Sequence, residues 1–572
     1  MSNERTKVPR FLCVWLYGKQ KLPDMEQTNL NRLKQDLIEE IDQRVKDRIL
    51  EPTNADLLRK LIRQADNENE AISIAALGTT YKRTGLHFDK RFERMTDDIS
   101  YFRRNTALSF HSDDSKPTHK LIIGDNYETL QNLLIQYRSA VDVIYIDPPY
   151  GKDSMGEFAQ TNYANAISRD NLLSMLYPRL MLAKQLLSDS GVIFCSIDDK
   201  NQAYVKCLFD EVFGEGNFIS TSIIMNNRGG RDYGGIAIQH EYLLIYAKDT
   251  CEYELNEIAD PDKRFFYKDE QGGFNLMELR NRNVKFNNRN RPNLFYPFYL
   301  NPNSKDINGL FQIALEPRAE FSIKVLPAIS QGIQTVWRWG KEEKSRANLN
   351  KEIFGKENQN GGYMIVQKYR KTTKMQRSIW DEKEFVNERG SEMIKDILGY
   401  GVFDYPKSMF LLKRVIELSS QPDATVLDFF AGSGTTGHAV LDLNKQDGGN
   451  RTFILCQLNE QTDTTPNGIA YDVTAKRLKR IMTGSCYDGT TDFKWAQSNT
   501  PYGGNLDVYE IDHVSNFEYT EGKSPFEVID ETLYGQKPFA TLREKIEWVC
   551  TRFANTQKRV EDDHEWAQRT QE

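Results

Sequence analysis

The tetrapeptide Asp147-Pro148-Pro149-Tyr150 directly follows an apolar run at residues 141–146. The two prolines end the predicted strand, remove two amide donors and restrict the backbone, so the loop presents its carbonyl oxygens in a stiff frame. Rigid acceptors suit the exocyclic amino group of a nucleobase, whose nitrogen lone pair is delocalised into the ring. Hydrogen bonds to the Asp147 carboxylate and the Pro148 carbonyl would favour a pyramidal, nucleophilic nitrogen, and Tyr150 could stack on the base. A simple strand terminator is the alternative.

A second motif, Phe430-Ala431-Gly432-Ser433-Gly434-Thr435-Thr436-Gly437, lies between a predicted strand and a predicted helix. Glycines let the backbone approach a ligand closely, and a helix N-terminus favours anionic or polar groups. The glycine spacing also fits a dinucleotide fingerprint, so a nicotinamide- or flavin-dependent oxidoreductase is an alternative. A purely structural tight turn is another.

Short apolar strands alternate with helices on both sides of residues 249–399, and this alternation predicts a doubly wound, mostly parallel α/β sheet. Asp125, Asp147 and Asp198 each follow a predicted strand. In parallel sheets, ligands bind beyond the carboxyl ends of the strands. We therefore expect these acids to share one edge of the sheet. Asp198-Asp199 resembles a metal-binding pair, but strand-end acids also cap turns, and no metal is predicted.

The α/β pattern is interrupted by a segment rich in Asn, Arg, Lys and aromatic residues. Two windows in it lack acids and would suit phosphate contacts with aromatic anchors, although charge runs are often only solvated surface. Helical spacing of leucine and isoleucine before residue 65 predicts a helical N-terminal region. The predicted division is 1–100 (helical), 101–250 (first catalytic part), 251–398 (insertion), 399–490 (cofactor-binding part) and 491–572 (mixed C-terminal segment). The basic residues of the two windows are Arg280, Arg282, Lys285, Arg289 and Arg291, then Lys368, Arg370, Lys371, Lys374 and Arg377.

Length and charge limit the possible classes of protein. A chain of 572 residues is long enough for about three or four domain-sized units. Its net charge of -7 gives no global indication of nucleic-acid binding, so any DNA contact must come from local basic surfaces. The seven cysteines lack the paired spacing of zinc sites. Without a signal peptide or a long apolar stretch, the expected location is cytoplasmic, with no membrane contact.

The order of these motifs resembles that of amino-directed DNA methyltransferases of the β class, most closely the modification (Mod) subunits of type III restriction-modification systems. The resemblance covers about residues 120–485. It rests on seven segments in order: Ile123-Gly124-Asp125-Asn126, Asp147-Pro148-Pro149-Tyr150, Ser190-Gly191-Val192-Ile193-Phe194, His240-Glu241-Tyr242-Leu243-Leu244-Ile245-Tyr246-Ala247-Lys248, Ser378-Ile379-Trp380, Phe403-Asp404-Tyr405-Pro406-Lys407-Ser408 and Asp428-Phe429-Phe430-Ala431-Gly432-Ser433-Gly434.

This resemblance implies methyl transfer from S-adenosylmethionine (SAM) to adenine N6 of a flipped base. It implies a seven-stranded, Rossmann-like sheet and a target-recognition insertion. Double-stranded DNA would be the substrate, the chain would form a homodimer, and ATP hydrolysis and cleavage would reside in a separate restriction subunit. Gln457 stands where a ribose-binding carboxylate is expected, with Glu460 as a substitute. The implied cofactor residues are Asp125, Asn126, Asp147, Phe403, Pro406, Lys407, Ser408, Asp428, Phe430, Ala431, Gly432, Ser433, Gly434, Thr435, Gln457 and Glu460.

Three alternatives stay open. A cytosine-N4 methyltransferase would use the same architecture, although Asp rather than Ser at position 147 favours adenine. An oxidoreductase would leave the double-proline loop unexplained. A non-catalytic DNA-specificity subunit would bind DNA without transferring a methyl group.

Overall fold

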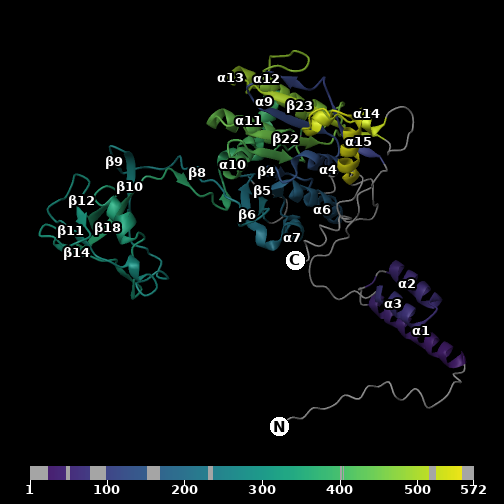
Figure 1. The fold of residues 1–572 in the computed structure, drawn as a ribbon, viewed down its shortest axis with the longest axis horizontal. Helices are drawn as coiled ribbons and strands as arrows, with labels where there is room; N and C mark the ends of the chain where they lie inside the picture. Colours follow the sequence, from purple (N-terminus) through teal and green to yellow (C-terminus); the bar gives the residue numbers. More distant parts are fainter. Residues whose placement is uncertain are drawn as a thin grey trace, which may run out of the picture. The chain divides into compact units, whose positions relative to one another are not determined.

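The computed structural model describes residues 23–46, 50, 52–77, 98–150, 168–229, 236–399, 402–403, 405–514 and 524–556. The chain divides into two compact units, residues 1–87 and 88–572. In the first unit, the described helices are α1 (Pro23–Lys46), α2 (Pro52–Gln64) and α3 (Glu68–Leu77) (Figure 1). Helix α2 begins at Pro52, which suits a first helical turn. Ile41, Leu58 and Ile62 form part of the small core between these helices.

The second unit is built on an eleven-stranded sheet with the order β1-β23-β3-β22-β21-β4-β5-β7-β6-β20, and β2 pairs with β23. From β23 to β5 all neighbours are parallel, whereas β7 is antiparallel to β5 and β6. The predicted α/β class is confirmed, and the sheet has eleven strands, four more than the expected seven. The additional strands β1, β2 and β23 lie at one side of the sheet and β20 at the other. The strands are β1 (Ile99–Arg104), β2 (Phe110–His111), β3 (Thr118–Ile123), β4 (Val141–Ile146), β5 (Leu187–Ile197), β6 (Phe218–Met225), β7 (His240–Ala247), β20 (Ile379–Trp380), β21 (Thr425–Asp428), β22 (Thr452–Gln457) and β23 (Asn505–Val514).

Both faces of this sheet are buried. Leu121 and Val143 belong to one hydrophobic core with residues of α10, α11 and α12. Ile122 and Ile144 are the alternate residues of the same strands, so they point to the opposite face, and they are also fully buried. In Figure 1, α4, α6 and α7 lie on one side of the strands and α9 to α13 on the other. The helices are α4 (Asn126–Tyr137), α6 (Ser168–Leu186), α7 (Gln202–Phe213), α9 (Asn387–Leu398), α10 (Met409–Ser419), α11 (Thr435–Asp447), α12 (Lys476–Thr483), α13 (Lys494–Ser498), α14 (Pro525–Val528) and α15 (Leu542–Arg552).

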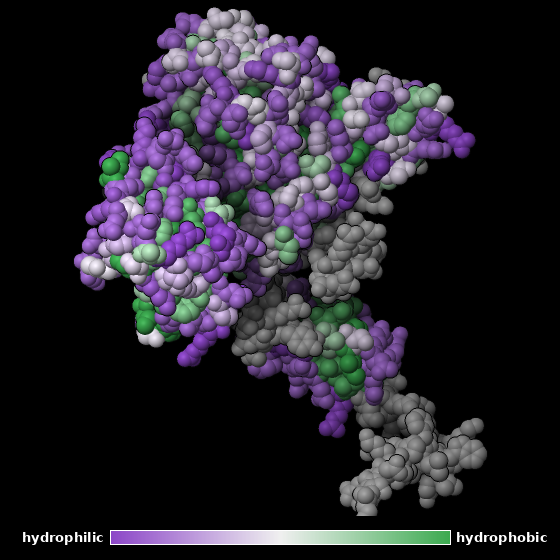
Figure 2. All heavy atoms as spheres, turned by 60° about the vertical axis from the view of Figure 1, so that its left-hand side comes forward, coloured by the Kyte–Doolittle hydropathy of each residue, from purple (hydrophilic) through white to green (hydrophobic). Residues whose placement is uncertain are grey.

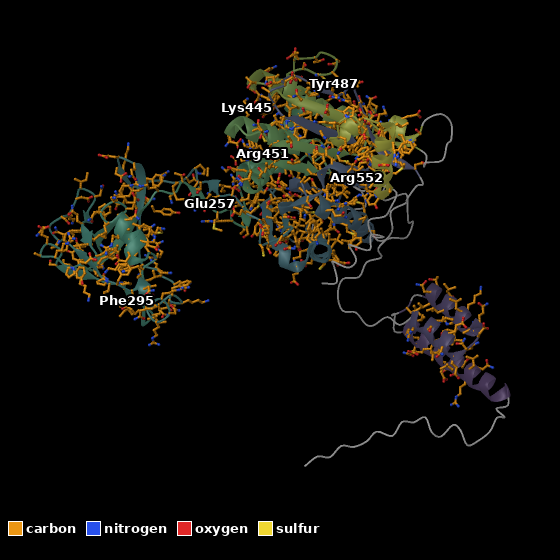
Figure 3. All side chains as sticks on the ribbon, viewed as in Figure 1. Glu257, Phe295, Lys445, Arg451, Tyr487 and Arg552 are labelled. Carbon is orange, nitrogen blue, oxygen red and sulfur yellow. The ribbon has the colours of Figure 1, made fainter. Side chains whose placement is uncertain are left out.

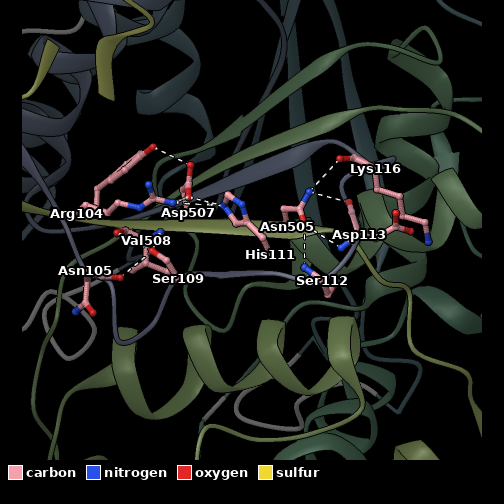
Figure 4. Close-up of polar contacts among 11 residues, drawn as sticks. Arg104, Asn105, Ser109, His111, Ser112, Asp113, Lys116, Asn505, Asp507 and Val508 are labelled. Atoms are coloured by element: carbon pink, nitrogen blue, oxygen red, sulfur yellow. Dashed lines mark hydrogen bonds and ion pairs between the residues drawn. The ribbon is translucent and has the colours of Figure 1, made fainter. Parts of the chain in front are cut away.

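The strand β23 differs from the predicted division, which sets residues 491–572 apart as a C-terminal segment. It lies between β1 and β3 in the main sheet. Figure 4 shows the polar contacts that hold it against residues 104–116. The Asp507 carboxylate contacts Arg104 and lies 3.0 Å from His111 Nε2, and the Asn505 side-chain oxygen accepts a 2.9 Å hydrogen bond from the Ser112 amide. The C-terminal segment therefore completes the sheet.

The insertion has its own β structure and its own core, which includes Phe298 and Trp337. The short antiparallel pair β8 (Ile258–Ala259) and β19 (Thr373–Lys374) closes its base, next to an ion pair between Glu257 and Lys371 (Figure 3). Its boundary precedes the predicted residue 398, because α9 packs on α12 and α13 of the main unit. Its strands are β9 (Tyr267–Asp269), β10 (Gly272–Glu278), β11 (Phe298–Leu300), β12 (Leu310–Phe311), β13 (Ile313–Ala314), β14 (Ile323–Val325), β15 (Ile329–Ser330), β16 (Ile333–Gln334), β17 (Ile353–Glu357) and β18 (Tyr363–Tyr369), with one short helix, α8 (Arg346–Asn348).

Within the described part of the chain, no helix is both long and apolar enough to span a bilayer.

Candidate active site

The predicted strand-end acids lie at one edge of the sheet. Asp125 follows β3 and Asp147 follows β4, while Asp428 is the last residue of β21 and Gln457 the last of β22. These four strands run parallel, in the order β3-β22-β21-β4. Their carboxyl ends therefore meet at the same edge, which is where ligands of such sheets bind.

The Asp147 loop is held from two sides. The Tyr150 hydroxyl donates a hydrogen bond to Asp147 Oδ1, and Lys407 Nζ lies 3.2 Å from the same oxygen. On the other side, Asn201 Nδ2 donates a 2.7 Å hydrogen bond to the Tyr150 carbonyl oxygen. Within the described residues, no hydrogen bond reaches Asp147 Oδ2. One carboxylate oxygen is thus used to fix the loop, and the other is available to a ligand.

Lys407 connects this loop to a buried carboxylate. Its side chain is 8% exposed, and Nζ donates hydrogen bonds of 2.7 Å to Glu241 Oε2 and 2.8 Å to the Tyr150 hydroxyl. Burial lowers the pKa of Lys407, but the Asp147 and Glu241 carboxylates outweigh burial and hold it above its ordinary value. Burial raises the pKa of Glu241, while Lys407 opposes that shift. The fully ionised cluster would contain two carboxylates and one ammonium, a net charge of -1.

Lys407 is among the cofactor residues that the resemblance implies, but its ammonium group lies against the Asp147 loop. Sequence reasoning missed Glu241, Asn226 and Asn201. Asn226 Nδ2 donates a 3.0 Å hydrogen bond to Glu241 Oε2, whereas the buried Glu241 Oε1 has no hydrogen-bond partner among the described residues. The sequence contains one indication, because Glu241 is an acidic residue at the start of the apolar run 240–247. In the structure Glu241 is 3% exposed, and a charge buried to this extent needs a partner.

The glycine-rich turn forms a close backbone cradle. Gly432 and Gly434 adopt left-handed torsions, with φ of 51° and 76°. A Cβ atom on Gly432 would lie 3.3 Å from the ring of Phe403 and would narrow the space above the turn. The Gly432 amide donates a 2.7 Å hydrogen bond to Gln457 Oε1, and Thr474 donates one of 2.6 Å to the Gly432 carbonyl. Both backbone polar groups of Gly432 are therefore held by hydrogen bonds, and the turn has little freedom to move.

Arg477, another residue that the sequence did not indicate, supports this turn from inside. Its Nη1 donates hydrogen bonds of 3.1 Å to Ser433 Oγ and 2.8 Å to Thr435 Oγ1. Burial lowers the pKa of Arg477 to about 9. Because Arg477 engages both hydroxyls, Ser433 and Thr435 would contribute to a ligand site mainly through their backbone.

Asp125 and Asn126 connect α4 to the neighbouring strand. Asp125 caps α4 by accepting a 2.7 Å hydrogen bond from the Tyr127 amide, and Asn126 Nδ2 donates one of 2.9 Å to the Phe429 carbonyl. The fully buried Arg179 donates to Asn126 Oδ1 and lies 3.3 Å from Asp125. Sequence reasoning missed this arginine, although an arginine in the apolar run 172–187 requires acceptors.

The remaining predicted cofactor residues line or support this edge. Ser408 Oγ donates a 2.5 Å hydrogen bond to the Glu384 carbonyl, and the Ala431 amide donates one of 3.1 Å to the Cys456 carbonyl. Gln457 Nε2 donates a 3.0 Å hydrogen bond to the Leu458 carbonyl, in addition to the bond that its Oε1 accepts. Gln457 therefore shapes the turn, and Glu460 follows it three residues later, in the loop after β22. Pro406 is buried, and Phe430 is half-buried.

Asp428 predicts a distinctive pH dependence of stability. Burial raises its pKa to about 7, although the Thr436 hydroxyl and the Phe430 amide donate to its carboxylate. The folded protein therefore holds this proton more tightly than the unfolded chain, and the stabilisation is lost as the pH rises from the unfolded value of 3.8 through about 7. Between pH 5 and pH 8, the Asp428→Asn variant should gain about 2–3 kcal/mol in free energy of unfolding relative to the wild type.

Urea unfolding at both pH values measures this difference, and Asp423→Asn, an exposed site just before the same strand, is the matched control. Parallel pH profiles for the Asp428→Asn variant and the wild type would contradict the prediction.

Comparisons with known proteins place these features in a family. Residues 141–462 match a family model described as DNA methylase. The Type II methyltransferase M.KpnI of Klebsiella pneumoniae is 35% identical over 396 residues, which cover 66% of this chain and 89% of that protein. The EcoPI Mod subunit of Escherichia phage P1, a type III restriction-modification enzyme, is 30% identical over 470 residues, or 74% of this chain and 70% of that protein.

Among solved structures, the M1.HpyAVI–SAM complex matches with a TM-score of 0.30 and 14% identity, over 63% of this chain and 98% of that one. The family assignment does not depend on this distant likeness. A mixed α/β sheet that carries an Asp-Pro-Pro-Tyr loop beside a glycine-rich turn defines the class of the protein. With the family match across both motifs, the chain belongs to the DNA methylase family.

Proposed function

We propose that this chain transfers a methyl group from SAM to adenine N6 in double-stranded DNA. The observation that carries the proposal is the Asp147 loop, which is clamped through Oδ1 while Oδ2 has no hydrogen-bond partner among the described residues. The loop lies at the same sheet edge as the Gly432 cradle. An acceptor for an amino group and a site for a methyl donor are thus next to each other.

The chain's own residues account for the chemistry. The target base must leave the duplex, because its amino nitrogen is inaccessible within the helix. Asp147 Oδ2 and the Pro148 carbonyl then accept the two N6 hydrogens and orient the nitrogen lone pair. Bound SAM supplies an electrophilic methyl group on a sulfonium. Transfer of this methyl group to N6 would leave a neutral thioether, and the Asp147 carboxylate would accept the N6 proton that is released.

The residues of this edge fit SAM. Asp125 would contact the cofactor adenine, and residues 430–434 with Pro406 and Ser408 would surround the methionine moiety. The left-handed Gly432 and the narrow space below Phe403 are features that a close-packed ligand requires. The net negative charge around Asp147 also favours a sulfonium cation.

Glu460 provides a test of this cofactor site. Glu460→Gln removes the carboxylate charge that we assign to the ribose hydroxyls, and a hydrogen bond to a charged group contributes about 1.5–3 kcal/mol. We expect KM for SAM to rise roughly 10- to 100-fold, with kcat within about twofold of the wild type. Asp463→Asn, an exposed site in the same loop, should leave both constants unchanged. An unchanged KM in the Glu460→Gln variant would remove Glu460 from the cofactor site.

The insertion is the proposed target-recognition region, and the seven strands β3-β22-β21-β4-β5-β7-β6 are the proposed catalytic sheet.

The two basic windows differ in their surroundings. In the second, Lys368 and Arg370 bind Asp269, and Lys371 and Lys374 also have acidic partners. In the first window, Arg280 and Arg282 are both bound to Glu278, whereas Lys285, Arg289 and Arg291 are exposed. Phosphate contacts are therefore assigned mainly to the first window, with Arg377 the exposed candidate in the second.

Similarity to the EcoPI Mod subunit supports a modification subunit of a type III-like system, with a homodimeric assembly and a separate restriction subunit as parts of the same proposal. Similarity to M.KpnI leaves a solitary methyltransferase as the second candidate. Co-expression with a neighbouring ATPase-nuclease gene and co-purification would distinguish the two.

Tritiated SAM incubated with duplex DNA from an unmodified host tests the activity. Transfer of label is expected, and digestion to nucleosides should give N6-methyladenine. Label in N4-methylcytosine would support methyl transfer but show that cytosine N4 is the target instead of adenine N6. No labelling of any duplex would overturn the proposal.

A further inference from the structure

We propose that the hairpin β15–β16 and the adjoining loop 281–291 form the element that reads base edges in the target duplex. The inference rests on the proposed function, since it takes DNA as the substrate. Loop 281–291 belongs to the first basic window, whereas the tip of the hairpin lies in neither window.

The hairpin presents apolar and amide side chains to solvent. Ile329 pairs with Gln334 and Ser330 with Ile333, and the turn between them has φ of 52° at Gln331 and 74° at Gly332. Two positive torsions are typical of a type I′ turn, where Asn is the usual first residue and Gln is uncommon. Ile329 is 67% exposed and Ile333 39% exposed. The exposed parts of these isoleucine side chains do not contribute to the core. A contact with a ligand would explain their exposure better than core packing does.

The base of the hairpin is rigid. Thr335 is fully buried, and its hydroxyl donates a 2.5 Å hydrogen bond to the Ala328 carbonyl. Gln334 Nε2 donates one of 2.5 Å to the Pro327 carbonyl. Two residues further, Trp337 is anchored in the core of the insertion by a 2.7 Å hydrogen bond to the Tyr296 carbonyl. A short ribbon anchored in this way can hold its tip in a defined orientation.

Loop 281–291 is joined to this base and carries the positive charge. The Asn281 amide donates a 2.8 Å hydrogen bond to the Val336 carbonyl, and the Asn288 amide donates one of 3.2 Å to the Gln334 carbonyl. Within the loop, Asn290 Nδ2 donates a 2.7 Å hydrogen bond to the Lys285 carbonyl, which fixes the turn. Neither residues 279–305 nor residues 321–341 include an aspartate or glutamate. Glu278, which precedes the loop, pairs with Arg282, so the positive charge of this surface comes mainly from Lys285, Arg289 and Arg291.

This combination matches the two kinds of contact that a DNA-reading surface makes. A two-stranded ribbon fits the major groove, where amides bind base edges and apolar side chains contact the thymine methyl. Gln331 supplies an amide at the tip, and Ile329 and Ile333 supply apolar groups on the two opposite faces of the ribbon. Lys285 and Arg289 of the adjoining loop can bind phosphates. On the hydrophilic surface of the insertion, Figure 2 shows separate hydrophobic patches rather than one broad apolar face. Small patches among cations favour a nucleic acid over a protein partner.

Three full-length variants separate base reading from phosphate binding. The tip variant is Gln331→Ala/Ile329→Ser/Ile333→Ser, the phosphate variant is Lys285→Ala/Arg289→Ala, and Ile307→Ser is the control, because Ile307 is a fully exposed isoleucine elsewhere in the insertion. Methylome sequencing after expression gives the target motif of each protein. Methylation rates and binding at several salt concentrations are then measured on duplexes with and without the wild-type motif.

The tip variant should methylate the wild-type motif at least about 30-fold more slowly, or a relaxed set of sequences, because each lost base contact is worth about 1–3 kcal/mol. Its salt slope should stay unchanged. The phosphate variant should bind all sequences more weakly, with a salt slope reduced by about two and an unchanged motif. The Ile307→Ser control should match the wild type.

If the tip variant keeps the wild-type motif and methylation rate, the inference is overturned. The hairpin would then have another role, such as docking a protein. If the tip variant melts at a lower temperature, Gln331→Asn decides, since Asn suits the turn and shortens only the amide's reach. A changed motif in this variant supports base reading, and an unchanged motif and rate overturns it. Failure of the wild type to methylate any DNA would instead refute the proposed function.

Discussion

Asp147→Ala should abolish methyl transfer while DNA binding persists. The substitution removes the carboxylate that we assign to the N6 hydrogens and to the proton released in the reaction. A positioned acid or base typically contributes 10²–10⁴-fold, and a lost electrostatic contact adds to this, so a fall in kcat of at least about 10³-fold is expected. Single-turnover transfer of tritiated methyl groups measures it.

The matched control for this experiment is Asp199→Ala, which removes an exposed acid just beyond the neighbouring strand β5. Its kcat should stay within about twofold of the wild type, as is usual for surface substitutions. Loss of DNA binding together with activity in the Asp147→Ala variant would indicate misfolding. Retention of more than a tenth of the wild-type rate would exclude Asp147 as the acceptor.

Lys407→Met should impair both stability and activity, and a second substitution should restore only the stability. In the single variant, Glu241 keeps its burial but loses the ammonium 2.7 Å away. Removing one partner of a buried pair typically costs about 3–5 kcal/mol, because the remaining charge is uncompensated. The fall in activity should be about 10²-fold, since Asp147 and Tyr150 lose the cation that fixes them.

The double variant Lys407→Met/Glu241→Gln removes both charges. Its free energy of unfolding should return to within about 1–2 kcal/mol of the wild type, because replacing a whole buried pair is often nearly neutral. The methylation rate should stay low, since the clamp on Asp147 is still absent. Urea unfolding and single-turnover transfer give the two readouts. Recovery of activity along with stability would show that Lys407 acts on the fold alone.

Much of the proposed site could be predicted from the sequence because its motifs are local. The prolines of Asp147-Pro148-Pro149-Tyr150 end a strand wherever they occur, and glycines permit the torsions of the turn at 432–434. Strand and helix periodicity also places Asp125 and Asp147 after parallel strands. Such features depend on residues that are close in the chain, so the α/β class and the position of the loop followed from composition and spacing.

Tertiary structure alone decided which distant side chains meet. Lys407 and Tyr150 are 257 residues apart in the chain, and no local pattern could indicate that their polar groups lie 2.8 Å from each other. The same is true of Asp269, which lies 101 residues before Arg370 and binds a window that seemed free to contact phosphates. The position of β23 likewise depends on its pairing with β1 and β3. In each case the deciding quantity is the burial of a charge or of a strand edge, and burial is a property of the folded chain.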